Sequence, residues 1–180
     1  KESNVLNISF IGYISYQDNH KKLLTKLKNN PKFVLYFIGK ESNTLRSFCN
    51  NNNIENVKLI DKFPPEKILD YYGEVNLINN LYGNNTPVLD YALSNKLYFA
   101  AELHIPILVC PGTYMAKLSK KYGFGIEIDI EKDNIAEMIY EKYQCINWAE
   151  LADGCNRFLE EVDKDNMVFN EMVKSINKHI

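Results

Sequence analysis

The fold is decided by residues 84–110, which read NNTPVLDYALSNKLYFAAELHIPILVC. This stretch predicts a loop, then a helix, then a buried strand. Ser94 is a favourable helix N-cap, because its hydroxyl can accept hydrogen bonds from backbone N–H groups of the first turn. The apolar run at residues 105–110 is long enough for a strand that is buried on both faces. The predicted inner face of the helix consists of Leu97, Ala100, Ala101 and His104.

The start of this helix is a candidate anion-binding site. Free backbone N–H groups and the helix dipole favour negative charge there, and Lys96 adds an ammonium group to the first turn. The alternative is a surface helix whose Lys96 is only solvated. Residues 84–110 by themselves leave both interpretations open.

Outward from this stretch, short apolar runs alternate with segments of helical spacing. Strands are predicted at residues 5–11, 33–38, 57–60, 75–78, 105–110 and 123–129. Helices are predicted at residues 19–27, 43–52, 65–72, 95–104, 114–122 and 134–143. Side-chain caps are expected for two of them, from Ser42 or Asn43 and from Asp133 or Asn134. The tail, residues 148–180, predicts two further helices with a break near residues 163–166.

This alternation indicates an α/β fold, namely a Rossmann-like parallel sheet with helices on both faces, plus C-terminal helices. Ligands of such sheets bind beyond the carboxyl ends of the strands. The candidate site therefore combines the start of the Ser94 helix with the loops at Gly12, Gly39, residues 61–63, residues 79–82 and Gly112. The polar segment 79–90 supports this placement, since long loops in compact domains are usually functional.

Composition and missing motifs exclude several functions. The formal net charge is −2, with both signs mixed along the chain, which argues against a partner nucleic acid. Neither a P-loop nor a G-x-G-x-x-G fingerprint follows the first strand. No signal peptide or membrane-spanning run is predicted. The separated cysteines are expected to be reduced thiols of a cytoplasmic protein.

A metal site is not expected. The run Asp163-Lys164-Asp165 resembles a metal-binding pattern, but it lies in a polar helical tail. A solvated break in the helix is the favoured interpretation of that run.

Several short segments occur in a familiar order: FIG at 10–12, FIG at 37–39, VKLI at 57–60, FP at 63–64, ILDYY at 68–72, SNKLY at 94–98, IPIL at 105–108 and YGFGI at 122–126. In this order they resemble the C-terminal, donor-binding half of GT-B fold glycosyltransferases, in particular those that build bacterial capsular and other surface polysaccharides. The resemblance covers most of the chain.

The resemblance implies that the chain consists of two parts. Residues 1–147 would form the nucleotide-sugar (donor) binding domain, and residues 148–180 would pack toward an N-terminal acceptor domain outside this chain. The implied activity is transfer of a hexosyl group from a nucleotide sugar to a growing polysaccharide or another glycan, and the chain is expected to be inactive alone. The implied partners are the donor and a glycan or lipid-linked acceptor, and the longer enzyme could associate peripherally with a membrane.

The resemblance also implies where the donor lies. The base and ribose would lie over Gly39 and Lys40 and over Asp61, Lys62 and Phe63. The diphosphate would meet Asn95, Lys96 and Leu97 behind the Ser94 cap. Gly12 would lie near the diphosphate and the sugar. Neither a cofactor nor a metal is expected.

One departure from the family concerns its carboxylates. Many retaining members carry two glutamates that bind the donor sugar and the ribose, and the corresponding positions here are Tyr91 and Phe99. The departure leaves open how the ribose is bound and whether the product retains or inverts the anomeric centre. Two alternative functions also stay open. One is a nucleotide-sugar 2-epimerase-like enzyme, which would need carboxylates and histidines in the cleft. The other is a non-catalytic nucleotide-binding or interaction module.

Overall fold

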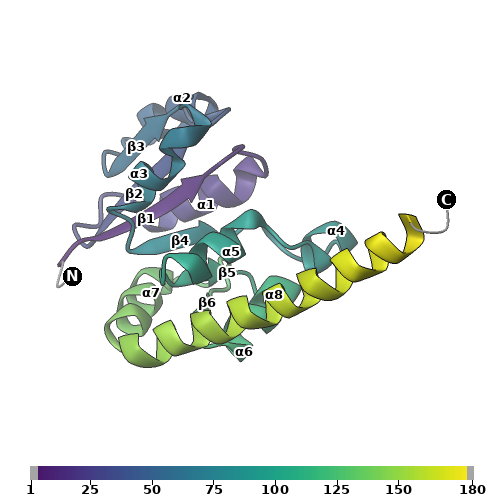
Figure 1. Cartoon of the computed structure of the whole chain (residues 1–180). Coiled ribbons are helices and arrows are strands. Elements are labelled where there is room, and N and C mark those ends of the chain that lie inside the picture. The colour runs from purple at the N-terminus through teal and green to yellow at the C-terminus, as the bar shows by residue number, and fades with distance from the viewer. Residues whose placement is uncertain (1–3, 178–180) are drawn as a thin grey trace.

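A parallel sheet organises the chain, whose computed structural model describes residues 4–177 (Figure 1). The sheet has six strands in the order β3-β2-β1-β4-β5-β6, and all neighbouring strands are parallel. The strands are β1 (Leu6–Ile11), β2 (Phe33–Ile38), β3 (Val57–Ile60), β4 (Leu77–Asn80), β5 (Ile107–Val109) and β6 (Gly125–Glu127). This topology confirms the predicted Rossmann-like α/β fold.

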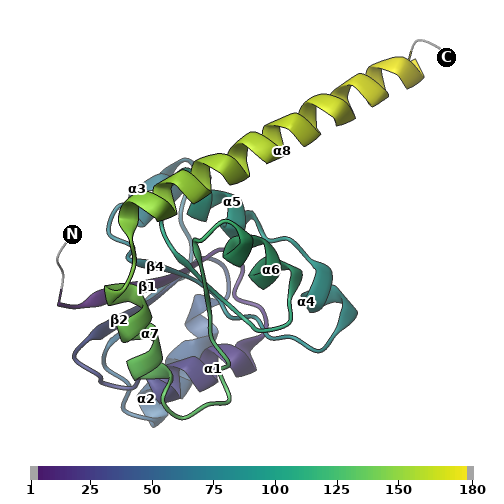
Figure 2. The ribbon, with the colours of Figure 1, turned by 90° about the horizontal axis from the view of Figure 1, so that it is seen from below.

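Helices cover both faces of this sheet (Figure 2). One face is covered by α1 (Gln17–Lys26), α2 (Arg46–Asn51) and α7 (Ile135–Gln144). The other is covered by α3 (Ile68–Tyr72), α5 (Asn95–Glu102), α6 (Tyr114–Lys121) and α8 (Trp148–Asn177). The strands alternate their side chains between two apolar cores, which explains the continuous apolar sequences of β2 and β5.

The segment around β4 differs from the prediction. The strand lies two residues later than residues 75–78, because Asn79 and Asn80 continue the ladder opposite Leu108 and Val109. The predicted polar loop then contains a short helix, α4 (Pro87–Tyr91). Thr86 caps this helix with its hydroxyl, and a proline in the first turn suits a helix start.

Two predicted caps are wrong. A 3₁₀ turn, η1 (Ser42–Leu45), precedes α2, and neither η1 nor α2 has a side-chain cap. Helix α7 likewise starts without one, since the Asp133 carboxylate pairs with Lys26 at 3.1 Å instead. Another 3₁₀ turn, η2 (Pro65–Lys67), leads into α3 with Pro65 in its first turn, as predicted.

The C-terminal tail forms one helix, so the prediction of two helices broken near residues 163–166 is wrong. Helix α8 runs over 30 residues without interruption, and residues 163–166 contain neither proline nor glycine to break it. Asp163 and Asp165 are exposed on its surface. No helix within residues 4–177 is long and apolar enough to cross a membrane.

The first half of α8 is anchored to the domain. Leu151, Cys155 and Phe158 are buried against the core that also holds α5. The Phe158 ring lies 5.4–5.8 Å from the ring centroids of Tyr98, Tyr122 and Phe124. Gly154 permits this close approach, because a Cβ there would collide with the Tyr122 carbonyl oxygen.

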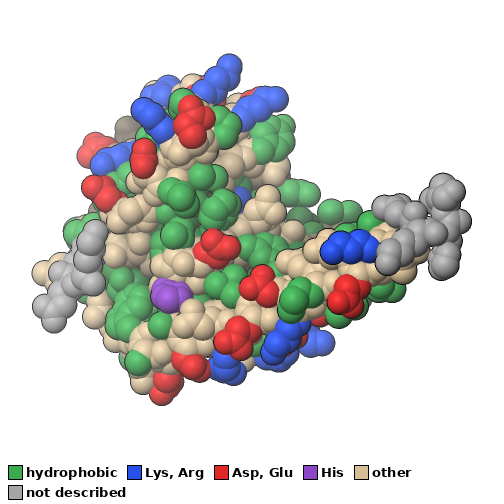
Figure 3. Space-filling model, viewed as in Figure 1, with side chains coloured by type: hydrophobic (Ala, Val, Ile, Leu, Met, Phe, Trp, Pro, Cys, Tyr) green, Lys and Arg blue, Asp and Glu red, His purple; other side chains and the backbone are tan. Residues whose placement is uncertain are grey.

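The second half of α8 projects away from the domain (Figures 1 and 2). Its hydrophobic side chains are exposed, and Figure 3 shows hydrophobic side chains on this projecting part. Phe169, Met172, Val173 and Ile176 recur at helical spacing. We call these four residues the apolar stripe.

Replacing a phenylalanine by alanine should have different effects in the two halves of α8. Phe158→Ala should lower the free energy of unfolding by about 3 kcal/mol, the usual cost of removing a buried aromatic ring. Phe169→Ala is the matched control and should change this free energy by less than about 0.5 kcal/mol, because Phe169 is exposed. Urea denaturation of both variants measures the difference, and equal losses would contradict the assignment of the anchor.

Candidate functional site

Two glycine turns shape the carboxyl edge of the sheet. Gly12 follows β1 and Gly39 follows β2, and both adopt positive φ angles, 139° and 130°. The Gly12 N–H donates to the Ile38 carbonyl at 2.8 Å, and the Gly39 N–H donates to the Ile60 carbonyl at 2.7 Å. A Cβ on Gly39 would collide with the Gly12 carbonyl oxygen. Gly39 is therefore required for the close approach of the two turns.

The other predicted residues of this edge follow those turns. Lys40 is exposed, and its ammonium nitrogen lies 5.6 Å from the centroid of the Tyr13 ring. After β3, Asp61 and Phe63 are half-buried and Lys62 is exposed. The fold thus brings the turns at Gly12, Gly39 and residues 61–63 onto one edge of neighbouring strands, as predicted.

The start of α5 forms as predicted, although Leu97 has a structural role. The Ser94 hydroxyl accepts from the Lys96 N–H at 3.3 Å. The Leu97 N–H donates to the Ser94 carbonyl at 2.9 Å, and the Leu97 side chain is fully buried. Asn95 is exposed. Ala100 and Ala101 lie on the inner face, but His104 is exposed and follows the helix, so its predicted place on that face is wrong.

Lys96 is buried, so the interpretation as a solvated surface lysine is wrong. It is only 6% exposed. Its Nζ donates to the Tyr82 hydroxyl at 2.8 Å and lies 4.0 Å from the centroid of the Phe10 ring. A Cβ on Gly12 would lie 3.4 Å from this nitrogen. The ammonium group therefore faces the Gly12 turn, as the sequence predicted. The surrounding aromatic side chains were not predicted.

The charge of Lys96 has no acidic partner in the described part of the chain. Within residues 4–177, the ion pairs involve other lysines and one arginine. Burial lowers the pKa of Lys96, and the nearby Tyr82 opposes this effect. Buried charges are normally paired, and Lys96 departs from this rule within the described residues.

His20 completes the enclosure. It comes from α1, is fully buried, and its ring centroid lies 4.6 Å from that of Phe10 and 5.1 Å from that of Phe37. Burial, reinforced by the charge of Lys96, lowers the pKa of His20 to about 4. His20 is therefore neutral at neutral pH and adds no positive charge to Lys96.

Two hollows lie near the start of α5. The inner hollow, a cavity of about 200 Å³, is lined by residues that include Asn80, Tyr82, Leu93, Ser94, Thr113 and Met115. It shares Tyr82 and Ser94 with the surroundings of Lys96.

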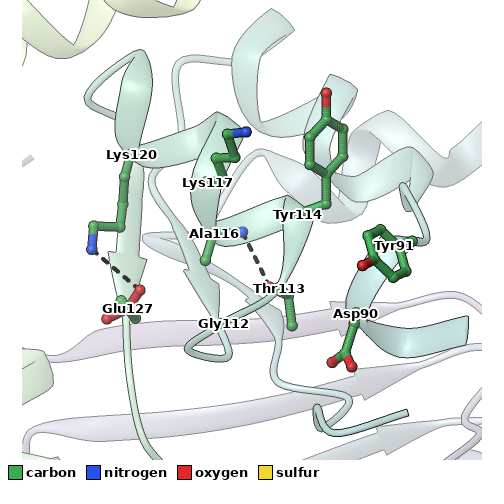
Figure 4. A pocket seen from close by; sticks show the side chains of 9 residues that line it. All are labelled: Asp90, Tyr91, Gly112, Thr113, Tyr114, Ala116, Lys117, Lys120 and Glu127. Atoms are coloured by element: carbon green, nitrogen blue, oxygen red, sulfur yellow. Dashed lines mark hydrogen bonds and ion pairs between the residues drawn. The ribbon is translucent and has the colours of Figure 1, made fainter. Parts of the chain in front are cut away.

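The outer hollow is larger, about 520 Å³, and lies between α4 and α6 (Figure 4). Tyr91 comes from α4, and Tyr114 and Lys117 come from α6. Lys120 and Glu127 form an ion pair at 3.2 Å there. Gly112 is the one position of the predicted site among the residues that line this hollow, so its size alone does not make it the candidate site.

Two residues of the Lys96 surroundings were not named as site residues from the sequence, and a third, Tyr82, was included only as part of a loop. Phe10 and His20 belong to β1 and α1, and only the fold brings them to Lys96. Tyr82 lies in the predicted loop 79–82, where an aromatic residue after a polar strand end was the available signal. No group of three or more His, Cys, Asp and Glu residues within 4–177 could hold a metal ion.

The two positions of the family's glutamates carry aromatic side chains. Tyr91 is exposed. Phe99 stacks on Tyr72 with ring centroids 5.2 Å apart and an interplanar angle of 29°. Both positions to which the resemblance assigns a glutamate therefore carry aromatic side chains.

The comparisons with known proteins identify the class of this fold. No protein-family model and no curated protein matches the chain. Sucrose-phosphate synthase from Thermosynechococcus elongatus is similar in structure, with a TM-score of 0.71 and 12% identity over 96% of this chain and 46% of that one. Anabaena Alr3699/HepE in complex with UDP-glucose has a TM-score of 0.71 and 14% identity over 96% of this chain and 49% of that one.

A third similar structure is the catalytic domain of cholesterol-α-glucosyltransferase from Helicobacter pylori, with a TM-score of 0.57 and 12% identity over 87% of this chain and 96% of that one. These neighbours are glycosyltransferases of the GT-B class, and the chain has the Rossmann-like α/β fold that it shares with them. The chain spans about half the length of the first two. At sequence identities of 12–14%, the structural similarity shows a shared fold.

The burial of Lys96 predicts that its aliphatic stem stabilises the protein. Lys96→Ala should lower the free energy of unfolding by about 1–2 kcal/mol through lost packing. Lys96→Met is the matched control, because it keeps most of the stem and removes the desolvated charge, and it should stay within about 0.5 kcal/mol of the parent. Thermal and urea unfolding measure both, and an unchanged Lys96→Ala variant would mean that the side chain is exposed in solution.

The low pKa of His20 predicts acid-sensitive folding. The unfolded chain binds a proton at His20 below about pH 6.5, whereas the folded protein binds one only near pH 4. Stability contributed by neutral His20 is therefore present above pH 6.5 and is lost toward pH 4, by at most about 1.4 kcal/mol per pH unit. His20→Phe should flatten this dependence in urea titrations between pH 7 and 4.5. An identical pH dependence in both proteins would contradict it.

Proposed function

We propose that this chain is the donor-binding part of a glycosyltransferase that uses a nucleotide sugar, with the diphosphate of the donor at the start of α5. One observation carries the proposal: the unpaired ammonium group of Lys96 faces the Gly12 turn. The GT-B-like fold supports it, and one similar structure is described as a complex with UDP-glucose.

The geometry provides for a diphosphate in three ways. The first turn of α5 directs the positive end of the helix dipole toward the ligand, while its Lys96 and Leu97 N–H groups already donate to Ser94. Gly12 has no side chain to block the approach of a phosphate to Lys96. A phosphate oxygen that accepts from Nζ would replace the Tyr82 hydroxyl and supply the negative charge that Lys96 lacks.

The same arrangement suits the chemistry of sugar transfer. Negative charge develops on the departing diphosphate when the bond to the sugar breaks. A preorganised ammonium group and helix start stabilise such charge. Lys96 and the start of α5 would thus act on the leaving group, and the base and ribose would extend along Gly39, Lys40 and residues 61–63 on the same edge.

The acceptor requires a further part of the protein. The apolar stripe lies on the part of α8 beyond its anchor. Its side chains are exposed, and no other element within residues 4–177 packs over them. We place an acceptor-binding domain against this stripe, consistent with neighbours about twice the length of this chain. The acceptor would be a growing capsular or other surface polysaccharide, another glycan or a lipid-linked glycan, and this chain alone would not transfer sugar.

The other two functions have weaker support. A 2-epimerase would use carboxylates and histidines in the cleft, but His20 is enclosed by aromatic rings and His104 contacts Asn156 of α8. The replacement of both family glutamates by Tyr91 and Phe99 favours a binding module without transfer activity as the second candidate. Detection of sugar transfer by a protein that includes the acceptor-binding part would exclude that candidate.

Calorimetric titration tests donor binding. UDP, GDP and their glucose conjugates are titrated into the chain with and without EDTA, and at least one nucleoside diphosphate should bind at micromolar to millimolar concentration. Lys96→Met should weaken this binding by about 1.5–3 kcal/mol, the scale of a hydrogen bond between charged groups, while Lys120→Met in the outer hollow should not. Absence of binding by every nucleotide at millimolar concentration would overturn the proposal.

A further inference from the structure

We propose that the outer hollow binds a neutral saccharide unit, and that this unit belongs to the acceptor glycan. The saccharide site depends only on the residues of the hollow, whereas its assignment to the acceptor rests on the proposed donor binding. Two features carry the inference: a pair of exposed tyrosine rings and a balanced set of charged side chains.

The tyrosine rings lie at one end of the outer hollow (Figure 4). Tyr91 from α4 is 77% exposed and Tyr114 from α6 is 39% exposed. They are two of the four exposed tyrosines of the chain, so exposed rings are concentrated here. Within residues 4–177 neither hydroxyl makes a hydrogen bond, and Tyr91 makes no ring contact. Gathered aromatic rings without a protein partner are typical of a surface that contacts a ligand.

The wall that carries Tyr91 is held in place by its own loop. The Asp90 carboxylate accepts from the Asn85 N–H at 2.8 Å. The Asn84 side-chain amide donates to the Pro111 carbonyl at 2.8 Å and so ties this loop to the turn after β5. The ring is therefore positioned before a ligand binds, which lowers the entropic cost of binding.

The charged side chains of the hollow balance one another. Lys120 and Glu127 pair at 3.2 Å, and this pair lies at the end opposite the two tyrosine rings (Figure 4). Lys117 and Asp90 add one charge of each sign. The hollow thus offers N–H donors and carboxylate acceptors without a net charge.

This combination of features suits a saccharide. A phosphate or another anion would find two lysines already balanced by two carboxylates, and it would leave the rings without contact. A purely apolar ligand would desolvate four charged side chains. A pyranose ring presents C–H groups to the tyrosine rings and hydroxyl groups to the charged side chains. The volume of about 520 Å³ also lies within the usual range of ligand sites, about 300–1,000 Å³.

The position of the hollow favours the acceptor over the sugar of the donor. The inner hollow shares Tyr82 and Ser94 with the surroundings of Lys96, whereas the outer hollow shares neither and adjoins the inner one at Thr113. The outer hollow is therefore the farther of the two from the proposed diphosphate. Helix α4 also lies on the side of the domain toward which the second half of α8 projects (Figures 1 and 2), where we place the acceptor-binding domain.

An NMR titration tests the site with cellotriose, maltotriose and chitotriose as neutral saccharide probes. At least one of them should bind with a Kd of about 1–10 mM and shift the backbone amide signals of Gly112, Tyr114 and Lys117. The shifts should persist when UDP or GDP is present at millimolar concentration, because the two sites are separate.

Variants of the rings identify the contact. Tyr91→Ala and Tyr114→Ala should each weaken trisaccharide binding by about tenfold, the scale of an aromatic side chain at the centre of a contact. Both side chains are exposed, so both variants should fold. Tyr91→Phe keeps the ring and should bind as the parent does. Tyr13→Ala is the matched control and should also bind as the parent does, because Tyr13 is 60% exposed and lies outside the hollow.

The outcomes separate this inference from the proposed function. Failure of all three probes to shift the amide signals of the outer hollow, or full binding by both alanine variants, would overturn the saccharide site whatever the nucleotides do. Shifts that appear only at the start of α5, or that UDP or GDP abolishes, would place the saccharide in the donor site and overturn the acceptor assignment. Trisaccharide binding without binding of any nucleotide would overturn the proposed donor binding and leave the saccharide site intact.

Discussion

The burial of both sheet faces restricts where chemistry can occur in this protein. The strands alternate their side chains between two apolar cores, so few polar side chains are buried in the sheet, and two of them, Asn79 and Asn80, lie where β4 ends. The two turns at Gly12 and Gly39 then bring the ends of β1 and β2 into backbone contact. Lys96 reaches the interior at this edge, and its burial follows from the same packing.

The enclosure of Lys96 balances opposing effects. Desolvation disfavours the ammonium form, whereas the Tyr82 hydroxyl and the face of the Phe10 ring favour it. Neutral aromatic groups stabilise a cation less than a carboxylate would, and they leave its charge available. The free protein thus holds a cation that an incoming anion can neutralise without first displacing a carboxylate.

The sequence predicted most of the sheet because strands buried on both faces have continuous apolar runs, as at residues 33–38. It misplaced β4, since Asn79 and Asn80 have low strand propensity and only pairing with β5 explains their place. The Ser94 cap and the place of Lys96 in the first turn of α5 were predicted from capping and helical spacing, and an anion-binding role for them stays a prediction. Its aromatic enclosure was not, because Phe10, His20 and Tyr82 are distant in the sequence and only the tertiary fold assembles them.

The single long helix at the end of the chain has a mechanical consequence. Gly154 fixes α8 against the Tyr122 backbone, and from there to its last described turn the helix extends by about 35 Å at about 1.5 Å per residue. Such an arm amplifies small movements at its base: a tilt of about 5° there displaces the far end by about 3 Å. A partner bound to the apolar stripe would therefore be displaced when side chains repack around Phe158, because the aromatic cluster at that residue holds the base of the arm.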